Sequence, residues 1–99
     1  MSPEFSIKFE KDARIDLAEA YDWYAIKGTF LANRFLTSVH ETLKFLATNP
    51  FLFQIYYKNF RQAPVKIFPY LIVFKVVNKE VIVFRVFHTK RNPKKKHKN

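Results

Sequence analysis

The stretch "FPYLIVFKVVNKEVIVFRVFH" (residues 68–88) decides the fold. It contains two long apolar runs, 70–77 and 80–88, that are separated only by Asn78 and Lys79. β-Branched and aromatic residues dominate both runs, which is typical of buried strands. Asn tolerates positive φ, so Asn78–Lys79 predicts a two-residue hairpin turn. A third strand is predicted over 61–67, with Phe68–Pro69 as a second tight turn.

Upstream of these strands the chain predicts one strand and two helices. Residues 5–10 alternate apolar and polar side chains, as in a half-buried strand. Apolar residues recur at helical spacing from about 13 to 24 and again from 31 to 46. Gly28, the only glycine, lies between the two helices where a C-cap favours glycine. Residues 51–60 are aromatic without a clear period and are interpreted as a packed loop.

The predicted order is therefore β-α-α-β-β-β, an α+β domain with a helical hairpin on one face of a small antiparallel sheet. We expect a single domain over 1–88 and a basic C-terminal tail over 89–99. Residues 44–99 carry thirteen Lys or Arg and one acid, Glu80, whereas 1–43 has net charge −2. Such a basic half favours phosphate or acidic protein surfaces as partners.

Alternation through the two predicted turns sorts the strand side chains into two faces. One face is almost wholly apolar and is expected to receive the helices; it includes Ile67, Arg85 and Phe87. The other is expected to combine apolar side chains with cations and to form an exposed binding surface. Its predicted members are Lys66, Leu71, Val73, Lys75, Phe84, Val86 and His88, with Lys90 and Arg91 at its edge. A slip of one residue would exchange the faces.

Most catalytic signatures are absent from the sequence. There is no cysteine, no phosphate-binding glycine loop and no pair of histidines at metal-ligand spacing, so we expect no cofactor and no metal. The start has no apolar signal region and no run is long enough to span a membrane, so we expect a cytoplasmic protein without a membrane partner. His88 ends a strand beside Thr89-Lys90-Arg91, where it can be structural or a proton-transfer group.

Three segments resemble the RelE/ParE superfamily of toxins from type II toxin–antitoxin, or plasmid stabilisation, systems. They are "DARIDLAEAYDWY" (12–24), the helix ending at "NP" (49–50), and the block from Phe68 to Pro93 that closes with His88-x-x-Arg91-x-Pro93. The resemblance implies the fold predicted above. It also implies growth inhibition, a cognate antitoxin that covers the sheet, and a toxin–antitoxin hetero-oligomer.

The superfamily implies two alternative targets. Its ParE-like branch poisons DNA gyrase without being a nuclease, and the Phe68-Pro69-Tyr70 and His88-x-x-Arg91-x-Pro93 features resemble this branch more closely. The RelE-like branch cuts mRNA on the ribosome and would use Lys66, His88 and Arg91 as catalytic residues. This chain departs from the nuclease pattern at Pro64 and Leu71, where that branch often has Lys and Arg, and it has no aromatic residue after Arg91.

Overall fold

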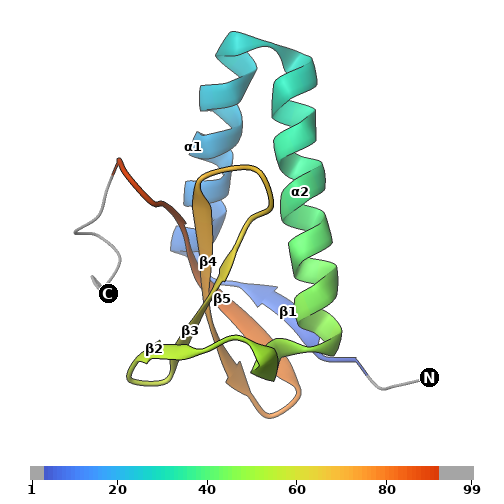
Figure 1. Cartoon of the computed structure of the whole chain (residues 1–99), viewed down its shortest axis with the longest axis vertical. Helices are drawn as coiled ribbons and strands as arrows, with labels where there is room; N and C mark the ends of the chain where they lie inside the picture. Colours follow the sequence, from blue (N-terminus) through green and yellow to red (C-terminus); the bar gives the residue numbers. More distant parts are fainter. Residues whose placement is uncertain (1–3, 92–99) are drawn as a thin grey trace.

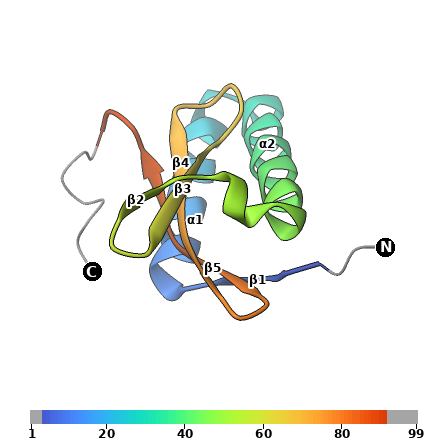
Figure 2. The same cartoon turned by 60° about the horizontal axis from the view of Figure 1, so that its bottom comes forward.

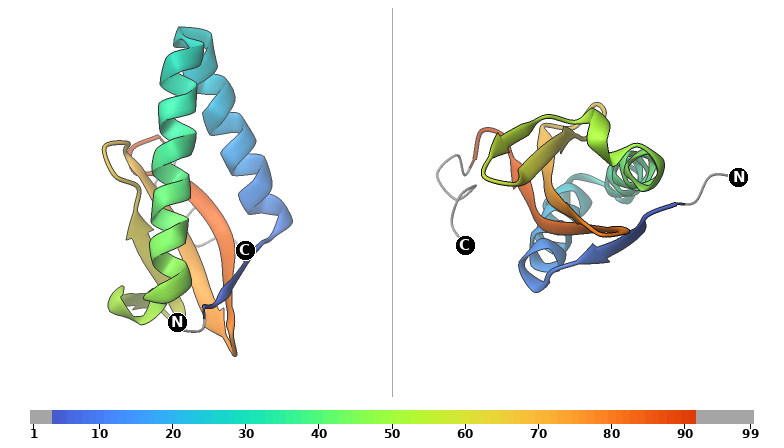
Figure 3. Two further views of the ribbon diagram at one scale, coloured as in Figure 1. Left: turned by 90° about the vertical axis from the view of Figure 1, so that its right-hand side faces the viewer. Right: turned by 90° about the horizontal axis from the view of Figure 1, so that it is seen from below.

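The structure is a computed structural model that describes residues 4–91. Two helices pack on one side of a five-stranded sheet (Figures 1 and 3). The elements in chain order are β1 (Ser6–Phe9), α1 (Lys11–Lys27), α2 (Thr29–Thr48), the 3-10 turn η1 (Pro50–Leu52), β2 (Ile55–Tyr57), β3 (Phe60–Pro64), β4 (Tyr70–Val77) and β5 (Glu80–His88). The predicted α+β class with a helical hairpin on a sheet is confirmed.

The sheet order is β1-β5-β4-β3-β2. β4 and β5 form the predicted hairpin, with Val77 opposite Glu80 and Asn78 at φ 55°. β1, however, pairs with β5 in parallel, so the sheet is mixed and the prediction of an antiparallel sheet was wrong. Alternation shows which side of a strand is buried, but not the direction of its neighbour. The predicted loop 51–60 also contains the short edge strand β2.

The third predicted strand ends earlier than expected. β3 stops at Pro64, which lies opposite Leu71, so the prediction of a strand over 61–67 with a tight turn at Phe68–Pro69 was wrong. Residues 65–69 form a loop closed by a hydrogen bond from Val65 N–H to Tyr70 O of 2.9 Å. This loop lets Phe68 turn into the core, where only 9% of it is exposed. Ile67, predicted on the buried face, is 69% exposed with φ 75°.

Both helices lie on the same side of the sheet (Figure 2), and their buried side chains differ in kind. α1 buries Ala13, Ala20 and Tyr24 along one stripe, and the alanines permit close approach to β5. α2 presents a wider apolar face. Both meet an aromatic cluster in which neighbouring ring centroids are 5.1–6.3 Å apart, mostly edge to face. Its members are Tyr24, Phe35, Phe68 and Tyr70.

A β-bulge in β5 changes which side chains face the helices. Val73 pairs with Arg85, but the next residue of β4, Phe74, pairs with Val83. Phe84 is therefore an extra residue in β5 with no partner opposite it in β4. Val83 and Val86 therefore both join the helix-side core, although they are three residues apart. The prediction that Phe87 faces the helices while Val86 and His88 face away was wrong for this reason. The Arg85 side chain does reach the helices, as predicted, because it bonds to Asp16 of α1.

Gly28 is the C-cap of α1, as predicted, and it is also the N-cap of α2, with φ 155° and ψ 137°. Its N–H bonds to the carbonyls of Tyr24 and Ala25 at 3.0 and 3.1 Å. A Cβ added there would meet no atom within 4 Å, so any penalty for a side chain comes from the backbone conformation alone.

We expect Gly28→Ala to lower the free energy of unfolding by about 1–3 kcal/mol, because alanine rarely adopts this φ. Urea denaturation followed by circular dichroism measures it. Thr37→Ala, at an exposed position on α2, is the control and should change stability by no more than about 0.5 kcal/mol. Equal stability of Gly28→Ala and the control would contradict the backbone argument.

Candidate functional site

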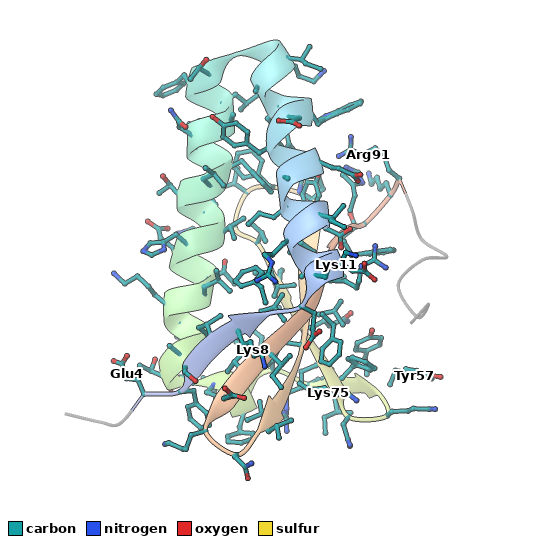
Figure 4. The ribbon with its side chains drawn as sticks, turned by 180° about the vertical axis from the view of Figure 1, so that it is seen from behind. Glu4, Lys8, Lys11, Tyr57, Lys75 and Arg91 are labelled. Carbon is teal, nitrogen blue, oxygen red and sulfur yellow. The ribbon has the colours of Figure 1, made fainter. Side chains whose placement is uncertain are left out.

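The chain folds back on itself after β5 and forms a polar hollow against α1. The hollow has a volume of about 230 Å³. We call its central residues, Trp23, Tyr70, His88 and Arg91, the C-terminal rim. Figure 4 shows Arg91 beside α1, at the end of the sheet away from the β4–β5 turn. The hollow is also lined by Asp16, Glu19, Ala20 and Val86.

Arg91 is held by two aromatic side chains. Its guanidinium carbon lies 4.1 Å from the ring centroid of Trp23, which is a cation–π contact. One guanidinium nitrogen donates a hydrogen bond to the hydroxyl of Tyr70. Burial raises the pKa of Tyr70, and the charge of Arg91 opposes that rise. Although Arg91 is an exposed residue three positions beyond the last strand, its charged group is fixed in direction.

His88 organises the turn that brings Arg91 to this position. Its Nδ1 accepts two backbone hydrogen bonds, from Lys90 N–H at 3.0 Å and Arg91 N–H at 2.8 Å. A nitrogen that accepts carries no proton, so the neutral ring has its hydrogen on Nε2. The pKa of His88 is lowered by burial first, and then by the charges of Arg91 and Lys90. The ring also packs edge-on against Tyr70, with centroids 4.9 Å apart.

An ion pair joins α1 to the bulged strand beneath the rim. The two carboxylate oxygens of Asp16 accept from Arg85 Nε at 2.7 Å and from a terminal nitrogen of Arg85 at 2.9 Å. The Asp16 Oδ2 atom also accepts from Val86 N–H at 3.0 Å. The hydrogen bond to Asp16 is the main reason that the pKa of Arg85 is raised. Both side chains are at most 20% exposed, so this pairing fixes α1 on β5.

The structure brings some of the predicted site residues together and separates others. His88, Lys90 and Arg91 share the C-terminal turn. Lys66 is exposed in the 65–69 loop and makes no hydrogen bond or ion pair within residues 4–91. The remaining four are on β4 and β5, and their pairings do not place them with the rim. They are Leu71, Val73, Lys75 and Phe84.

Sequence reasoning missed the residues that hold the site. Trp23 and Asp16 read as ordinary members of an amphipathic helix, and Tyr70 as a core residue. One signal was present: Arg85 interrupts an apolar strand, and a charge there needs a buried partner. Most of the predicted basic tail, including Pro93 and the lysines after it, lies outside the described residues. Among residues 4–91, no group of three acidic or histidine side chains is arranged to hold a metal ion. No helix there is long and apolar enough to cross a membrane.

Comparison with known proteins decides the family. Residues 7–93 match the family described as "ParE toxin of type II toxin-antitoxin system, parDE". The chain belongs to the ParE toxin family. A solved structure described as a chromosomal ParDE toxin–antitoxin system from P. aeruginosa has the same fold, with a TM-score of 0.75 at 23% identity. That match covers 85% of this chain and 95% of the other. A search of curated proteins finds no match.

We expect Asp16→Ala to lower the free energy of unfolding by about 2–3 kcal/mol, because Arg85 would remain partly buried without its carboxylate. Asp22→Ala is the matched control, since Asp22 is exposed on the same helix, and it should cost less than about 0.5 kcal/mol. Chemical denaturation of both variants measures the difference. Equal effects would show that the Asp16–Arg85 pair does not anchor α1.

His88 predicts a pH dependence of stability. Because its pKa is lower in the folded than in the unfolded chain, the unfolded state binds more protons, and stability should fall as the pH drops below about 6.5. His88→Asn keeps an acceptor for the two N–H groups but does not titrate. The wild type should therefore lose more stability than His88→Asn between pH 7.5 and 5.5 in denaturation experiments. The same pH dependence in both proteins would exclude His88 as its source.

Proposed function

We propose that this ParE family toxin inhibits growth by binding DNA gyrase through the C-terminal rim, and that a cognate antitoxin neutralises it. The observation that carries the proposal is the family match over residues 7–93, which includes the whole rim. Resemblance to the ParE-like branch implies that the target is gyrase. It also implies that the partner is an antitoxin encoded beside the toxin. The toxin–antitoxin hetero-oligomer is part of the same proposal.

The chemistry of the rim supports binding more than catalysis. The two backbone hydrogen bonds use the Nδ1 lone pair of His88 to shape the turn, which leaves only Nε2 toward other groups. The Arg91 guanidinium is fixed on Trp23 and Tyr70, so little conformational entropy is lost when it meets a partner. Arg and Trp are also the residue types that most often dominate binding energies at protein interfaces.

The nuclease alternative stays a prediction about Lys66, His88 and Arg91. Within residues 4–91 no hydrogen bond connects Lys66 to the other two. If the alternative holds, translating ribosomes supplied with message should show cuts that Lys66→Ala and Arg91→Ala abolish.

A supercoiling assay with purified gyrase tests the leading proposal. We expect the wild type to block supercoiling and to accumulate cleaved DNA. Arg91→Ala should need at least about tenfold more protein for the same effect, because it removes the fixed guanidinium at the centre of the rim. Arg34→Ala, which removes an exposed arginine from α2, is the matched control and should inhibit like the wild type.

Two results would contradict the proposal. Normal supercoiling in the presence of excess wild-type protein would exclude gyrase as the target. Equal loss in Arg91→Ala and Arg34→Ala would mean that the rim has no special role. Co-expression of the neighbouring reading frame tests the antitoxin: growth arrest caused by the toxin alone should disappear.

A further inference from the structure

A single row of side chains crosses all five strands on the side of the sheet away from the helices. Lys8 of β1 lies opposite Ile82 of β5, and Ile82 lies opposite Lys75 of β4. Directly paired residues on neighbouring strands share a face of the sheet. The ammonium of Lys75 lies 4.5 Å from the ring centroid of Phe60 in β3, and Phe60 pairs with Tyr57 of β2. We call Lys8, Ile82, Lys75, Phe60 and Tyr57 the outer row.

Aromatic rings hold two cations at one end of this row. Besides Phe60, the ring of Phe84 lies 5.4 Å from the Lys75 ammonium, so two rings hold one charge. The Lys58 ammonium lies 5.5 Å from the Tyr57 ring centroid. The Tyr57 and Phe60 rings are parallel within 7°, with centroids 6.4 Å apart. Cation–π contacts of this kind restrict flexible lysine side chains before a partner arrives.

The outer row does not belong to the C-terminal rim. Figure 4 shows Lys75 and Tyr57 together near the β4–β5 turn, whereas Arg91 lies at the opposite end of the sheet. Lys75 is five residues along β4 from Tyr70, which is about 16 Å in a strand. Gyrase binding at the rim therefore gives the outer row no role in target binding, and the resemblance implies only that the antitoxin, when bound, covers the sheet.

The charge of this region favours a polyanion as its partner. Residues 42–79, which include β2, β3 and β4, contain no Asp or Glu. The same segment has six Lys or Arg residues, and the whole chain has a net charge of +10. Two carboxylates flank the row, at Glu10 and at Glu80, which pairs with Ser6 and Val77. These carboxylates reduce the positive potential locally. Replacing one of them with a neutral residue should therefore strengthen anion binding.

We propose that the outer row binds single-stranded nucleic acid. Lys8 and Lys75 of the row, together with Lys58 beside it, contact phosphates, and Tyr57, which is 40% exposed, contacts an unpaired base. Cations interleaved with aromatic rings are the usual means of holding a single strand, because phosphates need charge and base faces need a flat apolar surface. A duplex keeps its base faces stacked inside, so the aromatic contact distinguishes the two forms. The proposal goes beyond gyrase binding and does not depend on it.

Fluorescence anisotropy with a labelled oligothymidine of about 16 nucleotides tests the row. The full chain is used throughout, so the basic residues after Arg91 contribute equally to every protein. Lys75→Gln should weaken binding several-fold and make the slope of log K against log salt shallower by about 0.7, the value for one phosphate contact on a single strand. Lys44→Gln removes an exposed lysine from α2 and is the matched control; it should change both quantities much less.

Three further variants separate charge, stacking and folding. Lys8→Gln alters an exposed side chain at the other end of the row and should weaken binding as Lys75→Gln does, even if loss of the Phe60 contact destabilises the latter. Tyr57→Ala should weaken single-strand binding but leave duplex binding unchanged. Glu80→Gln should tighten binding, whereas Glu41→Gln on α2 should not.

The proposal is overturned if the wild type binds no oligonucleotide, or if Lys75→Gln and Lys8→Gln lose no more affinity than Lys44→Gln. Equal affinity for duplex and single strand, or equal competition by polyglutamate, would replace it with a non-specific effect of charge. Because the assay contains no gyrase, its outcome is independent of the supercoiling experiment.

Discussion

The rest of the structure depends on the extra residue in β5. The bulge at Phe84 re-aims the last part of the strand, so that Val86 and His88 lie on the side of the helices. It also leaves the N–H of Val86 and the side chain of Arg85 available to one carboxylate on α1, that of Asp16. Without the bulge, strict alternation would turn His88 away from α1, and the C-terminal turn would have no aromatic surface to fold onto.

The side chains of the C-terminal rim are held in place because they pack against residues that are themselves fixed in the core. Tyr70 is fixed in the aromatic cluster by Tyr24 and Phe35, and it receives both the His88 ring and the Arg91 guanidinium. The hydrogen bond from Thr89 N–H to Pro69 O, at 2.9 Å, joins the turn to the 65–69 loop. The position of an exposed arginine is therefore determined by the packing of the core.

Much of the fold could be predicted because local chemistry determines it. Gly28 marks the break between the helices, and Asn78 marks the hairpin, since each adopts a backbone conformation that few residues tolerate. The bulge could not be predicted, because residues 81–87 are apolar on both faces except at Arg85, and alternation then carries little information about an extra residue. The same ambiguity concealed the 65–69 loop: whether Phe68 ends a strand or enters the core depends on Tyr24 and Phe35, which are far away in sequence.

The candidate site was only partly predictable for a related reason. The sequence marks His88, Lys90 and Arg91 by their place at the end of an apolar strand, but their chemistry comes from Trp23 and Tyr70, which no local pattern connects to them. The bulge has a second consequence for function. By turning His88 and Arg91 toward α1 while Lys75 stays with Phe60 and Phe84, it divides the cations of one basic half between two surfaces. The two surfaces are separate, so substitutions on one of them can be made without disturbing the other, and the two proposed interactions can be tested independently.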